Sequence, residues 1–246
     1  MKHFFLLLVL LAAIHSAHAQ TLTVSAAASL RDVMVPLGKM YQKKNPRVRL
    51  RFNLASSGAL QRQIENGAPV DVFISAAAKN VVDLIGQGLA LDPTRETVAR
   101  NRLVLVVPRD SVLRPRRFRD VLSPRIRRIA VGATGVPAGD RAREVFSKLG
   151  IWPRVARKAI RTRDVREALT QVQLGNVEAG VVYASDAAMA PVRVAAMAPA
   201  SMHEPIVYPA IVVTKSRNRA AARDFVRFLK TPQASAQFRR FHFLTF

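Results

Sequence analysis

Four segments of the sequence place small or hydroxyl-bearing residues directly before a predicted helix. They lie at residues 26–30 (Ala-Ala-Ala-Ser-Leu), 54–60 (Leu-Ala-Ser-Ser-Gly-Ala-Leu), 136–140 (Val-Pro-Ala-Gly-Asp) and 162–165 (Thr-Arg-Asp-Val). The first turn of a helix leaves backbone N–H groups unpaired at the positive end of the helix dipole, and small residues allow an anion to approach them. The repeated pattern therefore predicts a site for a small anion.

Each segment also has a purely structural interpretation. Ser29 and Ser57 could be ordinary N-caps, which are common and contribute about 1 kcal/mol each. Pro137 suits the first turn of a helix, and Thr162 or Asp164 could cap the fourth helix. Any one serine taken alone would favour the capping role, so the functional interpretation depends on the recurrence of the pattern.

The hydrophobic pattern predicts the elements that position these segments. In the first part of the chain it predicts strands at 22–26, 48–54 and 70–75, and helices at 30–41, 58–66 and 80–86. Strands that alternate with helices in this way favour a mostly parallel sheet with helices on both faces.

A second alternating series follows a stretch rich in arginine and proline. An apolar strand is predicted at 103–108, before this stretch, and after it the series comprises predicted strands at 128–132, 179–183 and 206–214, predicted helices at 140–149 and 165–174, and a last amphipathic helix around 225–229. Two such α/β units predict two lobes, which we assign to residues 20–102 with 207–246 (lobe I) and to residues 103–206 (lobe II). Because ligands of open α/β sheets bind beyond the carboxyl ends of the strands, the cleft between the lobes should gather several strand-to-helix junctions.

The N-terminus has the features of a secretory signal peptide. Lys2 precedes an apolar run of about eleven residues, and Ala17-His18-Ala19 has the form of a signal peptidase site. We predict cleavage after Ala19, which removes residues 1–19. The apolar run is too short to span a bilayer, which takes roughly 20 residues. The expected location is the periplasm.

Composition restricts the classes of function. The chain has no cysteine, which excludes disulfides, cysteine metal sites and a lipid-anchoring cysteine. The formal net charge is +23, and seven arginines lie between Arg114 and Arg128. Such a field attracts anions generally, from small ions to polyanions, but it is equally typical of a solvated basic surface and identifies no partner.

Seven short motifs together resemble a known family. They occur in the order Ala26-Ala27-Ala28-Ser29-Leu30, Ala55-Ser56-Ser57, 67–76 (Gly-Ala-Pro-Val-Asp-Val-Phe-Ile-Ser-Ala), Val136-Pro137-Ala138-Gly139, Asp164-Val165-Arg166, 181–186 (Val-Val-Tyr-Ala-Ser-Asp) and Tyr208-Pro209-Ala210. In this order they look like the periplasmic molybdate-binding proteins that feed ABC importers. The resemblance runs from about Thr21 to Phe243.

The resemblance implies a two-lobed type II periplasmic binding fold that closes on a tetrahedral oxyanion. It implies that Ser29 and Ser57 supply hydroxyl and backbone N–H donors, that Ala138 and Val165 supply backbone N–H groups, and that Tyr183 supplies its phenol. It further implies a monomer that needs no cofactor, has an ABC importer permease as partner, and binds no specific nucleic acid.

The donor set predicts which anions fit. A fully deprotonated dianion has only acceptors, so neutral donors can satisfy all its oxygens. Phosphate usually keeps a proton near neutral pH and would need an acceptor, and none is present among the five residues. Sulfate would have to be rejected by size. Molybdate and tungstate are nearly equal in size, so we expect the site to take both.

Two other classes of function are less well supported by the residues. An enzyme is not indicated, because the predicted mature chain keeps only His203 and His242 and lacks nucleophile-elbow and phosphate-loop motifs. The charge would suit a secreted polyanion-binding protein, but such proteins interleave aromatic residues with basic ones. Residues 114–128 contain a single aromatic residue, Phe118. A receptor of the same fold for sulfate or another small anion remains an alternative. Arg163 and Arg166 flank Val165 and could steer an anion, or simply face solvent.

Overall fold

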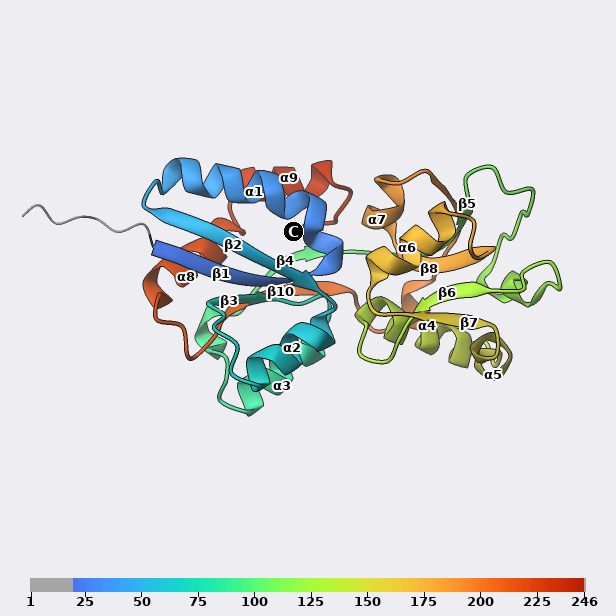
Figure 1. Cartoon of the computed structure of the whole chain (residues 1–246), viewed down its shortest axis with the longest axis horizontal. Coiled ribbons are helices and arrows are strands. Elements are labelled where there is room, and N and C mark those ends of the chain that lie inside the picture. The colour runs from blue at the N-terminus through green and yellow to red at the C-terminus, as the bar shows by residue number, and fades with distance from the viewer. Residues whose placement is uncertain (1–19, 246) are drawn as a thin grey trace, which may run out of the picture.

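The computed structural model describes residues 20–245, which form two lobes side by side (Figure 1). The first lobe contains a five-stranded sheet in the order β2-β1-β3-β10-β4, and the second contains one in the order β7-β6-β8-β5-β9. The predicted signal peptide, residues 1–19, lies outside the described residues. Within residues 20–245, no helix is both long enough and apolar enough to cross a membrane.

Four of the five strands in each sheet run in the same direction, which agrees with the predicted mostly parallel sheets, and one strand in each runs against them. The strands are β1 (Gln20–Ala27), β2 (Val48–Ala55), β3 (Val72–Ile74), β4 (Glu96–Arg100) and β10 (Val207–Val212) in the first sheet, and β5 (Leu103–Pro108), β6 (Ile129–Gly132), β7 (Ala159–Thr162), β8 (Ala179–Tyr183) and β9 (Val192–Met197) in the second. β2, β1 and β3 are parallel, as are β7, β6 and β8, whereas β10 and β5 pair antiparallel with their neighbours. The reason is that β10 and β5 begin where the chain crosses between lobes, the edge at which the parallel strands end.

Helices cover both faces of the first sheet (Figure 1). They are the short 3₁₀ turn η1 (Ala28–Leu30), α1 (Arg31–Lys44), α2 (Ser57–Glu65), α3 (Ala78–Gly86), α8 (Arg219–Phe228) and α9 (Pro232–Arg240). On one face Tyr41 of α1 packs its ring against Phe225 and Phe228 of α8. On the other face Leu60 of α2 and Leu84 of α3 belong to a separate buried cluster.

The second lobe repeats this arrangement. Its helices are α4 (Pro137–Lys148), α5 (Trp152–Ala156), α6 (Val165–Gln173) and α7 (Ala184–Ala188). α6 and α7 lie on one face of the sheet, and α4 and α5 on the other (Figure 1). α4 begins three residues earlier than the sequence pattern indicated, because Pro137 occupies its first turn.

The elements that the sequence analysis missed are those with weak hydrophobic patterns. These are β4, β7 and β9, together with α5, α7 and α9. β9 is a half-exposed edge strand with no fully buried residue, and α9 buries only Ala234 and Phe238. Such segments bury too little apolar surface to mark their period in the sequence.

The chain crosses from the first lobe to the second between β4 and β5, and returns between β9 and β10. Away from these crossings the lobes also touch directly. The backbone N–H of Gly58, in α2, donates to the carbonyl of Gly135 in the second lobe at 3.2 Å, and η1 lies against α6. The structure is therefore one with the lobes closed on each other.

Candidate anion-binding site

All five residues proposed from the sequence line one small cavity between the lobes. Ser29 and Ser57 come from the first lobe, whereas Ala138, Val165 and Tyr183 come from the second. The cavity is small and its walls are buried, since Ser57 and Tyr183 are at most 1% exposed. A ligand of a few atoms would therefore be surrounded from both sides once the lobes had closed.

Three helix starts point their first turns at this cavity. Ser57 is the first residue of α2, Ala138 the second of α4, and Val165 the first of α6. Backbone N–H groups at these positions have no acceptor within their own helix. They are available to an anion in the cavity, at the end of each helix that carries partial positive charge.

Asp164 is the N-cap of α6 and fixes the first turn of the helix, which includes the backbone N–H of Val165. Its carboxylate accepts hydrogen bonds from the backbone N–H groups of Arg166 and Glu167, at 2.8 and 2.9 Å. Of the two capping candidates in the sequence, Asp164 rather than Thr162 performs this role; the Thr162 hydroxyl instead donates to the Asp164 carbonyl.

Neither serine acts as a helix N-cap. The turn and helix starts at Ser29 and Ser57 show no side-chain capping hydrogen bond. The Ser57 hydroxyl instead accepts from the backbone N–H of Ala76 at 2.9 Å, so its own hydrogen remains free to donate into the cavity. The capping interpretation of these two serines is wrong, and both residues instead line the cavity.

Tyr183 places a buried hydroxyl at the cavity, and this hydroxyl has no hydrogen-bond partner among the described residues. Burial raises the pKa of the Tyr183 phenol well above its ordinary value, with Tyr208 and Asp186 adding to the effect. The phenol therefore stays protonated, and its hydrogen is available to an acceptor in the cavity. An unpaired buried hydroxyl costs about 1–3 kcal/mol, which a bound acceptor would recover.

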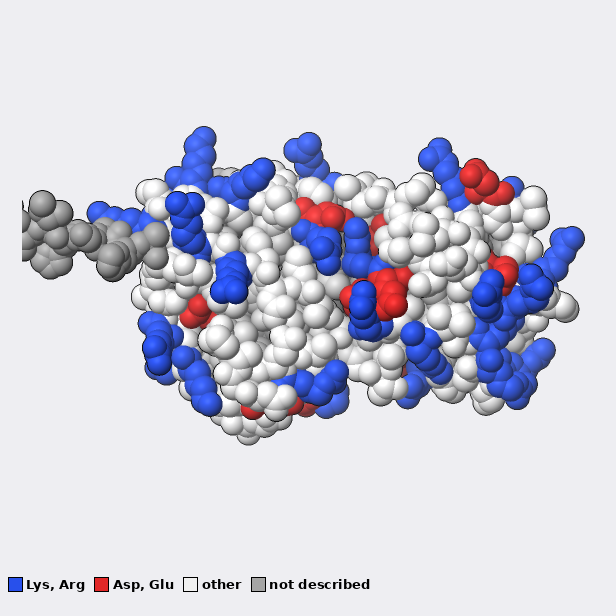
Figure 2. Space-filling view, in the orientation of Figure 1, with Lys and Arg blue, Asp and Glu red and all other residues white. Residues whose placement is uncertain are grey.

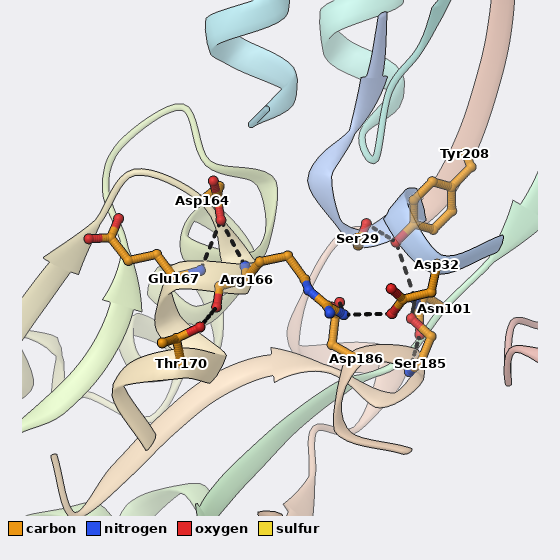
Figure 3. A network of polar contacts seen from close by, with 10 residues as sticks. All are labelled: Ser29, Asp32, Asn101, Asp164, Arg166, Glu167, Thr170, Ser185, Asp186 and Tyr208. Carbon is orange, nitrogen blue, oxygen red and sulfur yellow. Dashed lines mark hydrogen bonds and ion pairs between the residues drawn. The ribbon is translucent and has the colours of Figure 1, made fainter. Parts of the chain in front are cut away.

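The cavity itself contains no basic side chain. No lysine or arginine is among the residues that line it in the described part of the chain. Arg166 lies nearby, but its guanidinium is directed at Asp32 and Asp186, with Nη1–Oδ distances of 3.0 and 3.3 Å (Figure 3). Any charge on a ligand would thus meet no basic side chain; the one acidic residue of the lining, Asp164, uses its carboxylate to cap α6.

Sequence reasoning missed the residues that surround this donor set. Asn101, Tyr208 and Ser185 form a hydrogen-bonded group behind Ser29, and Asp32 with Asp186 holds Arg166 (Figure 3). Tyr208 and Asp186 fall within family-like motifs, but nothing in the local sequence indicates their partners.

A two-lobed α/β structure that encloses a buried cavity lined by hydrogen-bond donors defines a solute-binding protein. The chain belongs to the bacterial extracellular solute-binding protein family, which it matches over residues 22–244. This is a family of binding proteins and not of enzymes, as the sequence led us to expect.

Individual relatives agree with this placement. The chain is 36% identical to the molybdate-binding protein ModA of Haemophilus influenzae, over 86% of this chain and 85% of that one. It is 38% identical to ModA of Escherichia coli K12, over 90% and 88% of the two chains. The solved periplasmic molybdate-binding protein of Azotobacter vinelandii is 27% identical, covers 91% of this chain and 98% of its own, and superposes with a TM-score of 0.83. The sulfate-binding protein SubI of Mycobacterium tuberculosis, at 18% identity and a TM-score of 0.75, shares the fold.

Proposed function

We infer that this protein captures molybdate, and also tungstate, between its two lobes and delivers it to an ABC importer. The ligand would be held by the hydroxyls of Ser29 and Ser57, the backbone N–H groups of Ala138 and Val165, and the phenol of Tyr183. The relatives named for molybdate binding support this choice of ligand.

The single observation that carries the proposal is the unpaired, buried phenol of Tyr183. It faces the same cavity as two serine hydroxyls and three helix starts. Hydroxyl and N–H groups whose hydrogens are free to donate into the cavity are complementary to an anion that can only accept. Molybdate and tungstate are such anions near neutral pH, whereas phosphate retains a proton for which the five proposed ligand residues include no carboxylate or other dedicated acceptor. Sulfate has the same chemistry but is smaller, so size must exclude it.

The proposal extends to the protein's place in transport. We expect a monomer that is exported to the periplasm after loss of residues 1–19 and that presents both closed lobes to a membrane permease. Two lobes joined by two crossings can close on an ion and reopen. No cofactor is needed for this activity, since the ligand is the cargo.

The high positive charge does not require a polyanion as ligand. Lysines and arginines are spread over the visible face of both lobes and are especially dense at the far end of the second lobe (Figure 2). They lie outside the cavity. A general effect on solubility and on the approach of anions accounts for such a distribution.

Thermal melting with molybdate, tungstate, sulfate and phosphate added separately tests the proposal. At about 100 times the dissociation constant a ligand stabilises the folded state by about 2.7 kcal/mol, which for a chain of this size raises the melting temperature by roughly 5–10 °C. Molybdate and tungstate should produce this shift, and sulfate and phosphate should not. A shift with sulfate alone would show that the protein is a sulfate receptor. If no oxyanion shifts the melting temperature and the protein is retained on heparin at physiological salt, the protein would be a polyanion-binding protein and not a receptor for a small anion.

A further inference from the structure

A buried chain of hydrogen bonds connects one of the lobe crossings to Ser29 in the cavity wall (Figure 3). Asn101 lies in the crossing between β4 and β5. Its Nδ2 is 2.8 Å from Ser185 Oγ and 3.1 Å from the hydroxyl of Tyr208. The Tyr208 hydroxyl is in turn 2.9 Å from Ser29 Oγ. All four residues are buried.

The direction of the first link is fixed by the backbone around Asn101. Its side-chain oxygen Oδ1 accepts from the backbone N–H of Arg102 at 2.9 Å, and lies 3.5 Å from that of Ser185. Both partners are donors, so the oxygen must face them and the amide nitrogen must face the other way. Nδ2 therefore donates its two hydrogens to the hydroxyl oxygens of Ser185 and Tyr208.

The direction of the second link follows from the first. The Tyr208 oxygen already accepts from Asn101, and its own hydrogen needs an acceptor because the side chain is fully buried. Ser29 Oγ is its only hydrogen-bond neighbour among the described residues that can accept. If Ser29 donated instead, the phenolic hydrogen of Tyr208 would be left unpaired, which buried groups avoid. Burial also raises the pKa of Tyr208, so this hydrogen is retained.

Ser29 consequently receives a hydrogen bond from behind and keeps its own hydrogen for another acceptor. Since Ser29 lines the cavity, that acceptor is a ligand. We propose that Asn101 and Tyr208 are positioning residues, which orient the Ser29 hydroxyl as a donor and so select oxyanions that carry no proton. This rests on the proposed function, because it concerns the same cavity.

Two further hydroxyls of the cavity, those of Ser57 and Tyr183, also have hydrogens that are free to donate to a ligand. Ser57 Oγ accepts from the N–H of Ala76 and so also directs its hydrogen elsewhere, and Tyr183 presents an unpaired phenol. An anion with an O–H group would have to aim that hydrogen at a hydroxyl oxygen whose own hydrogen is directed at the anion, or at Asp164, whose carboxylate already accepts two backbone hydrogen bonds. Without Tyr208, Ser29 could turn and accept, and the selection against a protonated anion would weaken.

A double-mutant cycle with Tyr208→Phe and Ser29→Ala tests this assignment. Tyr208→Phe removes the hydroxyl but keeps the ring that packs edge-on against Tyr183 and Phe243. By calorimetry, Tyr208→Phe should weaken molybdate binding roughly tenfold in the wild-type background and hardly at all in Ser29→Ala, because its effect passes through Ser29. Equal losses in both backgrounds would mean that Tyr208 acts only through packing, and would overturn the proposal.

The matched control is Tyr41→Phe. The Tyr41 hydroxyl donates to the carbonyl of Ala221 in the first lobe at 3.3 Å, away from the cavity, so its loss should leave molybdate affinity unchanged in both backgrounds. Melting of the unliganded variants establishes that each is folded.

Selectivity provides the second readout. At about pH 8, where phosphate is mainly the singly protonated dianion, phosphate should displace molybdate more readily from Tyr208→Phe than from the wild type. Equal displacement would overturn the selective role. If the wild type instead binds sulfate and not molybdate, the proposed function fails, but the same cycle measured with sulfate still decides the role of Tyr208.

Discussion

Arg166 on α6 of the second lobe contacts Asp32 on α1 of the first lobe, with 3.0 Å between Nη1 and Oδ2 (Figure 3). The same guanidinium nitrogen lies 3.3 Å from Oδ1 of the fully buried Asp186 on α7. Arg166 directly follows Val165, whose backbone faces the cavity. An ion pair between the lobes can exist only when they are together, so it stabilises the closed form beside the cavity.

Asp32→Asn should therefore weaken ligand binding by accelerating release. The pair is about one-quarter to one-third exposed, and such pairs contribute at most about 1 kcal/mol, or roughly fivefold in affinity. Stopped-flow measurements should place most of this change in the dissociation rate. Asp83→Asn is the control, because it breaks an exposed pair with Lys79 within α3 and should change neither rate. An effect of Asp32→Asn on association alone would contradict a role in holding the lobes closed.

Asp186 should make the stability of the protein depend on pH in a defined direction. Burial raises the pKa of Asp186 from 3.8 to about 7, against the lowering effect of Arg166 and with a raising contribution from Asp32. Between about pH 4 and pH 7 the folded state then binds more protons than the unfolded state does, so this group makes the protein less stable as pH rises through that range. Above about pH 7 its contribution is constant.

Comparison with Asp186→Asn isolates this contribution from other carboxylates. The difference in unfolding free energy between variant and wild type should shift in favour of the variant from about pH 4 to pH 7, with a slope approaching about 1.4 kcal/mol per pH unit. Urea unfolding at several pH values measures it. A constant difference across that range would show that Asp186 titrates normally.

The sequence predicts the parts of this molecule that have a regular hydrophobic period. The helix starts at Ser57 and Val165 were located because apolar residues recur at helical spacing after them. The antiparallel direction of β5 and β10 was not predictable, because a buried apolar run looks the same in either direction.

Contacts between distant segments were also beyond reach of the sequence. Arg166 and Asp32 are 134 residues apart, and their pairing results from two separate sheets being brought together. From the sequence, Arg166 could either steer an anion or face solvent, whereas its contacts with two carboxylates make it part of the lobe interface. The sequence around Arg166 does not indicate which acidic residues it contacts.

Gly58→Ala should prevent full closure of the lobes without destabilising the open protein. A Cβ at Gly58 would lie 2.4 Å from the carbonyl oxygen of Gly135, which belongs to the other lobe. Alanine is favoured over glycine inside a helix by about 1 kcal/mol, so the unliganded variant should melt at the same or a higher temperature. Molybdate affinity should fall at least about tenfold by calorimetry.

Gly86→Ala is the matched control, because this glycine ends α3 and a Cβ there would meet nothing within 4 Å. It should leave the affinity unchanged. Normal binding by Gly58→Ala would show that the contact between Gly58 and Gly135 is not needed in the liganded form.

Tyr183→Phe should affect stability and binding in opposite directions. In the unliganded protein the buried hydroxyl has no partner among the described residues, and its removal should raise the unfolding free energy by about 1 kcal/mol. The same change removes one donor to the ligand, so affinity should fall roughly 10- to 100-fold. Melting without ligand and calorimetry with molybdate measure the two effects. A loss of stability with unchanged affinity would remove Tyr183 from the site.

Arginines at the mouth of the cleft should set the rate of anion capture. A surface groove next to the cavity is lined by Arg31 of the first lobe and by Arg163, Arg166, Asp164 and Glu167 of the second. The Arg163 side chain is 85% exposed and makes only a loose pair with Glu167, with 3.5 Å between Nε and Oε2, so its field extends into solvent. Long-range attraction acts on encounter and is screened by salt, whereas the contacts that hold the ligand act on release.

Replacing both Arg31 and Arg163 by glutamine should therefore lower the association rate for molybdate roughly threefold at low salt and leave the dissociation rate nearly unchanged. The difference should vanish as ionic strength rises, since screening removes the same attraction from the wild type. A charge-matched control replaces Arg49 and Arg51, which are exposed on β2 and absent from the residues that line the groove. If the control slows association as much as the mouth variant does, the total charge of the protein attracts the anion, and the position of Arg31 and Arg163 is immaterial.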